Sequence, residues 1–231
     1  MTRFKTQEEL KYHLDGLTQG ERNEFIIRTY LDARTDNLTG FPNERSLRED
    51  LGDMRSQDGY CLYFGDILSL KSANDNYGYD VGNALIIYSL LILRKSLSDF
   101  SKDFEVYREH GDEIVGITRD VDEGTSDIIL ERIRRYCEIS NLVRSLELNG
   151  TNLITEEEKK MIDWVNETMG NLRIYRREIT LPDELPVMIS IGYGSSGDPY
   201  EALDHARKMS KEDKRSFYER HPELDSRGRK V

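Results

Sequence analysis

Short apolar runs that alternate with longer helical patterns constrain the fold of this chain most. The segment Tyr60–Ile67 is an apolar and aromatic run between turn signals, which is typical of a buried strand. Residues 71–80, rich in Asn, Asp, Gly and Tyr, are expected to form a loop. Strands separated by helices predict an α/β domain. Further strands are expected at 104–108, 114–118, 172–179 and 187–193, and helices at 6–33, from near 43, 81–97, 127–148, 155–169 and 199–218.

The predicted elements divide the chain into three regions. Residues 1–34 form a helical extension, interrupted near Gly16 and Gly20. Residues 35–218 form one α/β domain, and residues 219–231 form a polar tail. Apolar residues make up 37% of the chain, which suffices for one sizeable core and is thin for two. We therefore expect a single domain with a short N-terminal addition.

The charge and the cysteines exclude several classes of protein. A formal net charge of -11 disfavours binding to nucleic acid duplexes and to anionic membranes, because both require a basic surface. Cys61 and Cys137 stand far apart without a CxxC spacing, so a disulfide framework is not expected. The most apolar stretch, Ala84–Leu93, is half the length of about 20 residues that a membrane helix needs. A cytoplasmic protein without a membrane span is predicted.

Three polar segments follow one another in an informative order. They are DNLTGFPN at 36–43, DILSLKSANDNYGYDVGN at 66–83 and REHGDEI at 108–114. A strand with Ser190–Gly192 and a helix with Asp204, Lys211 and Arg215 follow them. Over about residues 35–215 this order resembles the GGDEF family of diguanylate cyclases, with a degenerate HGDEI signature. The resemblance implies a palm-like central mixed sheet flanked by helices, to which the helical segment at about 127–170 is an addition.

The carboxylates of this order suit a metal site. Mg²⁺ prefers hard oxygen ligands, and Asp66 at a strand end faces Asp112 on the predicted hairpin. In the family, the positions of Asp66, the Ile67 carbonyl and Asp112 bind metal. The resemblance assigns Asp112 and Glu113 to catalysis, with Mg²⁺ or Mn²⁺ as cofactor. The alternative is that Asp112 and Glu113 form a solvated hairpin tip.

Cations and amides of the same segments match the family's substrate contacts. Lys71, Lys211 and Arg215 match positions that hold a triphosphate, for which cations are chemically suited. Asn74 and Asn83 match the two positions that recognise guanine. For Lys211 and Arg215 the alternative is a solvated charged helix face, and for Asn74 it is an Asx turn.

Several residues depart from the family pattern. His110 replaces a glycine, and we expect a steric or stacking role for its ring rather than metal binding. Asn83 replaces an aspartate. The window of the family's Arg-x-x-Asp inhibitory motif reads SKDF at 101–104, so no product-inhibition site is expected.

Two functions from different classes are consistent with these residues. The first is a nucleotidyl cyclase that condenses two nucleoside triphosphates, GTP and possibly ATP, into a cyclic dinucleotide such as cyclic di-GMP. The family works as a head-to-head dimer, so the resemblance implies a homodimer. The second is a degenerate domain that regulates by binding a nucleotide or a protein. His110 and Asn83 favour the second, and the first is favoured by Asp66, Lys71, Asp112 and Glu113.

Overall fold

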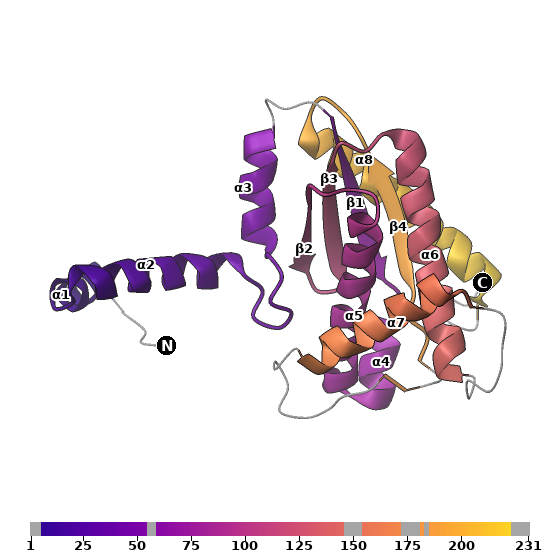
Figure 1. The fold of residues 1–231 in the computed structure, drawn as a ribbon, viewed down its shortest axis with the longest axis horizontal. Coiled ribbons are helices and arrows are strands. Elements are labelled where there is room, and N and C mark those ends of the chain that lie inside the picture. Colours follow the sequence, from indigo (N-terminus) through magenta and orange to yellow (C-terminus); the bar gives the residue numbers. More distant parts are fainter. Residues whose placement is uncertain (1–5, 55–58, 146–153, 172–180, 183–184, 223–231) are drawn as a thin grey trace.

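The computed structural model describes residues 6–54, 59–145, 154–171, 181–182 and 185–222, and its helices and strands form an α/β fold (Figure 1). The α/β class predicted from the sequence is confirmed. The helices are α1 (Gln7–Asp15), α2 (Gln19–Arg34), α3 (Glu44–Met54), α4 (Leu70–Tyr77), α5 (Tyr79–Ser98), α6 (Glu123–Ser145), α7 (Glu156–Asn171) and α8 (Pro199–Arg220), and the strands are β1 (Tyr60–Ile67), β2 (Phe104–His110), β3 (Glu113–Arg119) and β4 (Ile189–Gly194).

The described strands form a four-stranded sheet in the order β2-β3-β1-β4. Each of its three pairs is antiparallel, so the expectation of a mixed sheet is wrong for these strands. The physical reason lies in the order of the strands. The helices α4 and α5 do join two strands that run in the same direction, β1 and β2, but β3 lies between them. Parallel strands are therefore present without being hydrogen-bonded to each other.

Each face of the sheet is covered by a different set of helices. Along β1 the side chains alternate, so Cys61 and Tyr63 face one side and Leu62 and Phe64 face the other. The first side packs against α5, α6 and α7, and the second against α3 and α8. The helices α1 and α2 extend away from this body in Figure 1. The core therefore lies in two layers around one sheet.

The apolar helix α5 lies at the centre of the larger layer. By length and composition it could cross a membrane, but 72% of its most apolar window is buried inside the protein. Leu85, Leu90 and Leu93 are fully buried there. Core helices of globular proteins are hydrophobic on all sides when they are covered on all sides, which accounts for this composition.

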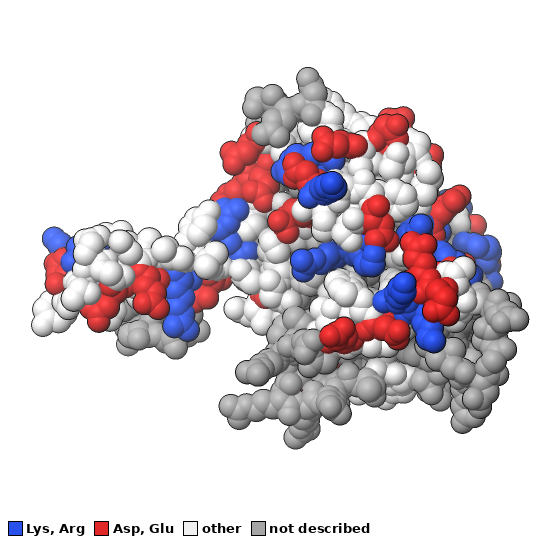
Figure 2. All heavy atoms as spheres, in the orientation of Figure 1, with Lys and Arg blue, Asp and Glu red and all other residues white. Residues whose placement is uncertain are grey.

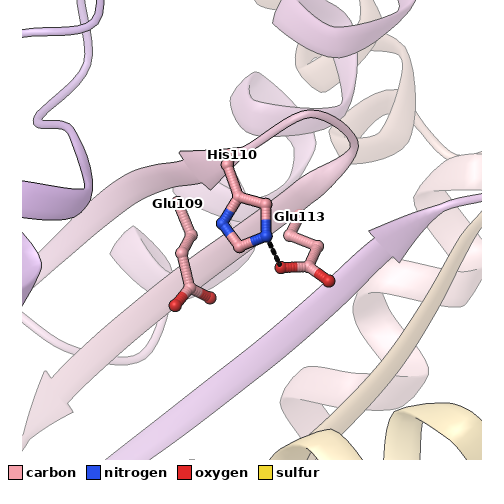
Figure 3. Close-up of side chains that lie close together, drawn as sticks. All are labelled: Glu109, His110 and Glu113. Atoms are coloured by element: carbon pink, nitrogen blue, oxygen red, sulfur yellow. Dashed lines mark ion pairs between the residues drawn. The ribbon is translucent and has the colours of Figure 1, made fainter.

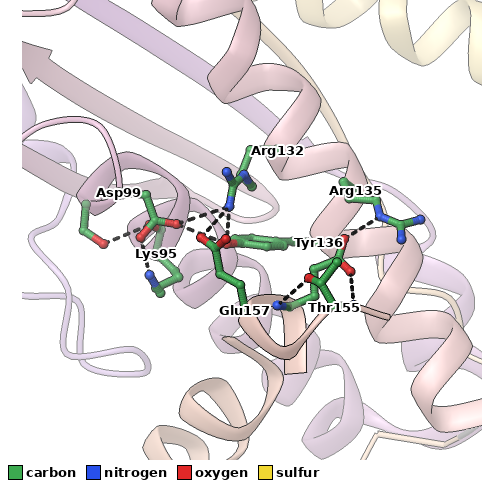
Figure 4. Close-up of polar contacts among 9 residues, drawn as sticks. Lys95, Asp99, Arg132, Arg135, Tyr136, Thr155 and Glu157 are labelled. Atoms are coloured by element: carbon green, nitrogen blue, oxygen red, sulfur yellow. Dashed lines mark hydrogen bonds and ion pairs between the residues drawn. The ribbon is translucent and has the colours of Figure 1, made fainter. Parts of the chain in front are cut away.

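Ion pairs join α6 and α7, the two helices that lie largely within the segment at about 127–170 predicted as an addition. Arg135 Nε lies 2.8 Å from Glu158 Oε1, and Arg132 Nη1 lies 3.3 Å from Glu157 Oε1. Arg132 also lies 3.9 Å from Asp99 at the end of α5, so its guanidinium lies between two acids from different helices (Figure 4). Exposed ion pairs contribute little individually, so the apolar contacts beneath them hold α7 in place.

Capping residues set several helix starts. Thr18 and Glu21 form a reciprocal capping box at the start of α2. Asn43 Oδ1 accepts from the backbone N–H groups of Arg45 and Ser46 at 3.0 and 3.2 Å and so caps α3. The break predicted near Gly16 is present, because α1 ends there.

Two sequence predictions differ from the structure or lie beyond it. The loop predicted at 71–80 is wrong, because α4 occupies Leu70–Tyr77 and α5 begins at Tyr79. Its polar composition reflects a short helix in which only Ala73 is fully buried. The strand predicted at 172–179 lies outside the described residues, as does the part of the predicted tail from residue 223 onward.

Candidate active site

The residues predicted to bind metal are backbone neighbours where β1 ends and β3 begins. Asp66 is the cross-strand partner of Glu113, and opposite residues of this kind have Cβ atoms about 4.5–5.5 Å apart. The Ile67 N–H donates to the Asp112 carbonyl oxygen at 2.9 Å. The structure therefore places Asp66, Ile67, Asp112 and Glu113 at one end of the central strand pair.

Arg108 fixes the hairpin that carries Asp112 and Glu113. Its Nη1 lies 3.0 Å from Asp36 Oδ1, and its Nη2 donates to the Gly111 carbonyl oxygen at 3.0 Å. The first and third polar segments of the sequence are thus joined by one guanidinium. Burial acts to raise the pKa of Asp36, but hydrogen bonds from Thr39 and Arg108 outweigh it and lower the pKa below its ordinary value.

Lys214 on α8 is a site residue that the sequence analysis did not identify. Its Nζ lies 2.6 Å from Asp66 Oδ1, and both side chains are about four-fifths buried. The helical spacing contains the signal, because Leu203, Ala206 and Ser210 are buried on the face that Lys214 continues. A cation at the end of a buried helical stripe is directed toward the sheet.

Glu113 also contacts the histidine that departs from the family signature. His110 Nε2 lies 2.9 Å from Glu113 Oε2, so the expected steric or stacking role is replaced by a polar contact (Figure 3). Burial raises the pKa of Glu113 above its ordinary value. The charges of Glu109 and Asp112 act in the same direction, whereas His110 and Arg207 oppose them.

The two asparagines predicted to read a base lie close together at the junction of α4 and α5. A Cβ atom on Gly82 would lie only 1.9 Å from Asn74 Oδ1, so that side chain packs on the backbone beside Asn83. Both asparagines are half-buried.

The start of α4 offers unpaired donors next to the carboxylates. Ser69 precedes the helix in a left-handed conformation with φ 64° and makes no side-chain cap. Its Oγ is buried and has no hydrogen-bond partner within the described residues. Lys71, predicted to hold phosphate, is exposed in the first turn. Helix N-termini with free N–H groups favour anions.

The other two predicted phosphate ligands lie on the outer side of α8. Lys211 is exposed, and the Arg215 side chain is 82% exposed with its Nε 2.9 Å from Glu219 Oε1. The structure does not bring either side chain into contact with the carboxylates. The solvated charged face considered as an alternative therefore describes both residues in this structure.

The oxygen donors at the end of β1 fit a divalent cation. Asp66, the Ile67 carbonyl and Asp112 form an all-oxygen set, which is the ligand type that Mg²⁺ and Mn²⁺ prefer. Lys214 balances the charge of Asp66 from the α8 side. On the face drawn in Figure 2, acidic and basic side chains are interleaved, so that face has no continuous basic surface among its described residues.

Comparison with known proteins establishes the family. The sequence model described as "Diguanylate cyclase, GGDEF domain" matches residues 33–155, which is more than half of the chain. The chain belongs to the GGDEF domain family. A comparison with curated proteins finds no match.

Solved structures agree with the fold. The coiled coil and GGDEF domain of DgcB from Caulobacter crescentus, in complex with c-di-GMP, matches with a TM-score of 0.64 at 20% identity, covering 91% of this chain and 96% of that chain. The diguanylate cyclase SiaD from Pseudomonas aeruginosa, in complex with its activator SiaC, matches with a TM-score of 0.54 at 19% identity. The match covers 90% of this chain and 70% of that chain. The FimX GGDEF domain from the same organism matches with a TM-score of 0.55 at 10% identity, and the match covers 79% of this chain and 94% of that chain. At these identities the likeness concerns the fold.

Proposed function

We propose that this chain is a nucleotidyl cyclase that joins two nucleoside triphosphates into a cyclic dinucleotide. The observation that carries the proposal is the pairing of Asp66 with Glu113 across adjacent strands, beside Asp112 and the start of α4. Two solved structures of similar fold support the proposal: DgcB is bound to c-di-GMP, and SiaD is described as a diguanylate cyclase.

Each group at the end of β1 has a task in this reaction. When bound, Mg²⁺ or Mn²⁺ neutralises phosphate charge and acidifies the attacking 3′-hydroxyl. Asp66, the Ile67 carbonyl and Asp112 would hold the cation. Glu113 accepts the proton from the 3′-hydroxyl, a role that suits a carboxyl whose pKa is raised by burial. Orientation of the two triphosphates supplies much of the remaining acceleration.

The first turn of α4 receives the triphosphate in this proposal. Its free N–H groups, the unpaired Ser69 Oγ and the exposed Lys71 provide donors and positive charge within a few residues of Asp66. Lys211 and Arg215 lie on α8 and not on α4. In this proposal they contact the outer phosphates once Arg215 has broken its ion pair with Glu219. Such an exposed ion pair costs little to break.

A second copy of the chain completes the reaction, because each site holds one of the two triphosphates. The described part of α2 exposes several apolar side chains, with Ile26, Ile27, Tyr30 and Leu31 each more than half exposed. The DgcB structure that covers 91% of this chain includes a coiled coil. We assign the apolar side of α2 to pairing with the same helix of a second copy.

Dimer formation predicts a specific response to protein concentration. Activity is expected to rise more steeply than linearly near the dimer dissociation constant, since only dimers turn over. The double variant Ile27→Lys, Leu31→Lys is expected to sediment as a monomer where the wild type is dimeric, with Arg28→Ala as a control on the same helix. Full specific activity in a sample that sediments only as monomer would contradict the assignment.

Base choice follows from Asn83. An aspartate accepts from both N1–H and the 2-amino group of guanine, whereas asparagine offers one acceptor and one donor group, which match adenine. We expect the wild type to use ATP beside GTP and Asn83→Asp to shift the preference toward GTP by about 5- to 150-fold. Competition of both triphosphates in one reaction measures the shift, and Asn76→Asp, on the exposed face of α4, controls for added charge. A wild type restricted to GTP that Asn83→Asp leaves unchanged would show that Asn83 does not read the base.

The second candidate is a nucleotide-binding regulatory domain without catalysis. It is favoured by the contacts of Lys214 with Asp66 and of His110 with Glu113, since both hold proposed catalytic carboxylates in ion pairs. Equilibrium binding of GTP and ATP, measured beside product formation in Mg²⁺ or Mn²⁺, separates the two functions. Tight binding with no product would favour the regulatory domain.

A further inference from the structure

Three potential metal ligands meet at the hairpin between β2 and β3. One carboxylate oxygen of Glu109, one ring nitrogen of His110 and one carboxylate oxygen of Glu113 lie within 4.8 Å of one another. Figure 3 shows the imidazole between the two carboxylates. Consecutive strand residues normally face opposite sides, but a register shift between Arg108 and His110 interrupts the pairing here. The bulge accounts for the approach of both neighbours to Glu113.

Glu109 provides an independent sign that this cluster lacks a ligand. Its side chain is only 9% exposed, and its Oε2 is buried with no hydrogen-bond partner in the described part of the chain. Its Oε1 contacts Arg207 Nη2, which fixes the orientation of the carboxylate. Leaving a buried carboxylate oxygen unpaired is unfavourable, and a bound cation would satisfy it.

We propose that Glu109, His110 and Glu113 form a binding site for a transition-metal dication of the Zn²⁺ type. Imidazole is a good ligand for Zn²⁺ and a poor one for Mg²⁺, which prefers oxygen. Two carboxylates and one imidazole leave a fourth tetrahedral position for water. His110 Nε2 exchanges its contact with Glu113 for the metal, a small movement because the side chain is 63% exposed. Arg207 orients Glu109 as groups behind metal ligands commonly do.

This site shares no ligand with the oxygen site of Asp66, Ile67 and Asp112, because its ligands are Glu109, His110 and Glu113. Its effect on catalysis rests on the proposed function: a zinc-bound Glu113 cannot accept the proton of a 3′-hydroxyl, so Zn²⁺ would inhibit turnover. Binding itself requires no catalytic activity. The two proposals can therefore fail separately.

Titration calorimetry of Zn²⁺ into the full chain, with excess Mg²⁺ and without nucleotide, tests the site. One Zn²⁺ per chain is expected to bind the wild type. The variants His110→Ala and Glu109→Gln are expected to bind Zn²⁺ at least about 10- to 100-fold more weakly than the wild type. His205→Ala, which removes an exposed histidine on α8 outside the cluster, is expected to bind as the wild type does.

Far-UV circular dichroism confirms that each variant is folded before titration. Glu109→Gln retains the shape of the side chain but removes its ion pair with Arg207, and His110 is largely exposed. Absence of Zn²⁺ binding by the wild type in excess Mg²⁺ would overturn the proposal. Equal affinity of the wild type and His110→Ala would overturn it as well, because the bound metal would then lie elsewhere.

Discussion

Asp66→Asn and Asp112→Asn are each expected to slow dinucleotide formation by about 10²- to 10⁴-fold. Loss of one charged metal ligand removes several kcal/mol, roughly 3–5, of stabilisation from a transition state in which phosphate charge is redistributed. Steady-state rates in saturating Mg²⁺ measure the effect. Because Asp66 pairs with Lys214, the circular dichroism spectrum of that variant needs to match the wild type before its rate is compared.

A matched control separates the loss of a ligand from a general loss of negative charge. Asp53→Asn makes the same chemical change on an exposed position of α3, away from the hairpin, and is expected to retain wild-type turnover. Wild-type turnover in both site variants would show that these carboxylates do not bind the catalytic metal. A loss in Asp53→Asn of similar size would point to a nonspecific effect of charge.

Gly192→Ala is expected to destabilise the fold by about 3 kcal/mol or more. A Cβ atom at this position would lie 2.4 Å from the Ala206 carbonyl oxygen, so α8 would have to move away from β4. Backbone atoms cannot rotate aside as a side chain can, and overpacking a close contact typically costs 1–3 kcal/mol or more. Urea unfolding measures the change.

The same substitution at another glycine is expected to act in the opposite direction. Gly52 lies in the exposed part of α3, and a Cβ there would meet nothing within 4 Å. Alanine is favoured over glycine in a helix by about 1 kcal/mol, so Gly52→Ala is expected to raise the free energy of unfolding. Equal stability of Gly192→Ala and the wild type would mean that α8 does not pack on β4 as described.

The sequence pattern predicts the strands that carry the carboxylates of the site. The apolar run Tyr60–Ile67 matches β1 to the residue, because a strand buried on both faces has a continuous apolar sequence between turns. The hairpin at 104–118 was predicted from two β-rich runs around a polar turn, and its strands extend slightly further than predicted. Local patterns of this kind fix elements and their order.

Features that depend on distant residues were not accessible to the sequence analysis. The mixed sheet implied by the family resemblance is wrong for the described strands, because β3 lies between the parallel strands β1 and β2. Lys214 and Arg207 reach Asp66 and Glu109 only through the packing of α8 on the sheet. The helix α4 was read as a loop, since a short polar helix that buries one alanine carries almost no periodic signal.

Mass spectrometry of the product tests the central claim most directly. Purified protein is incubated with GTP or ATP and Mg²⁺ or Mn²⁺, and Asp112→Asn serves as the blank. We predict a cyclic dinucleotide formed from two triphosphates with release of two pyrophosphates by the wild type, and none above background by the variant. Unchanged triphosphates in every reaction with dimeric, folded wild-type protein would contradict the assignment of this chain as a cyclase.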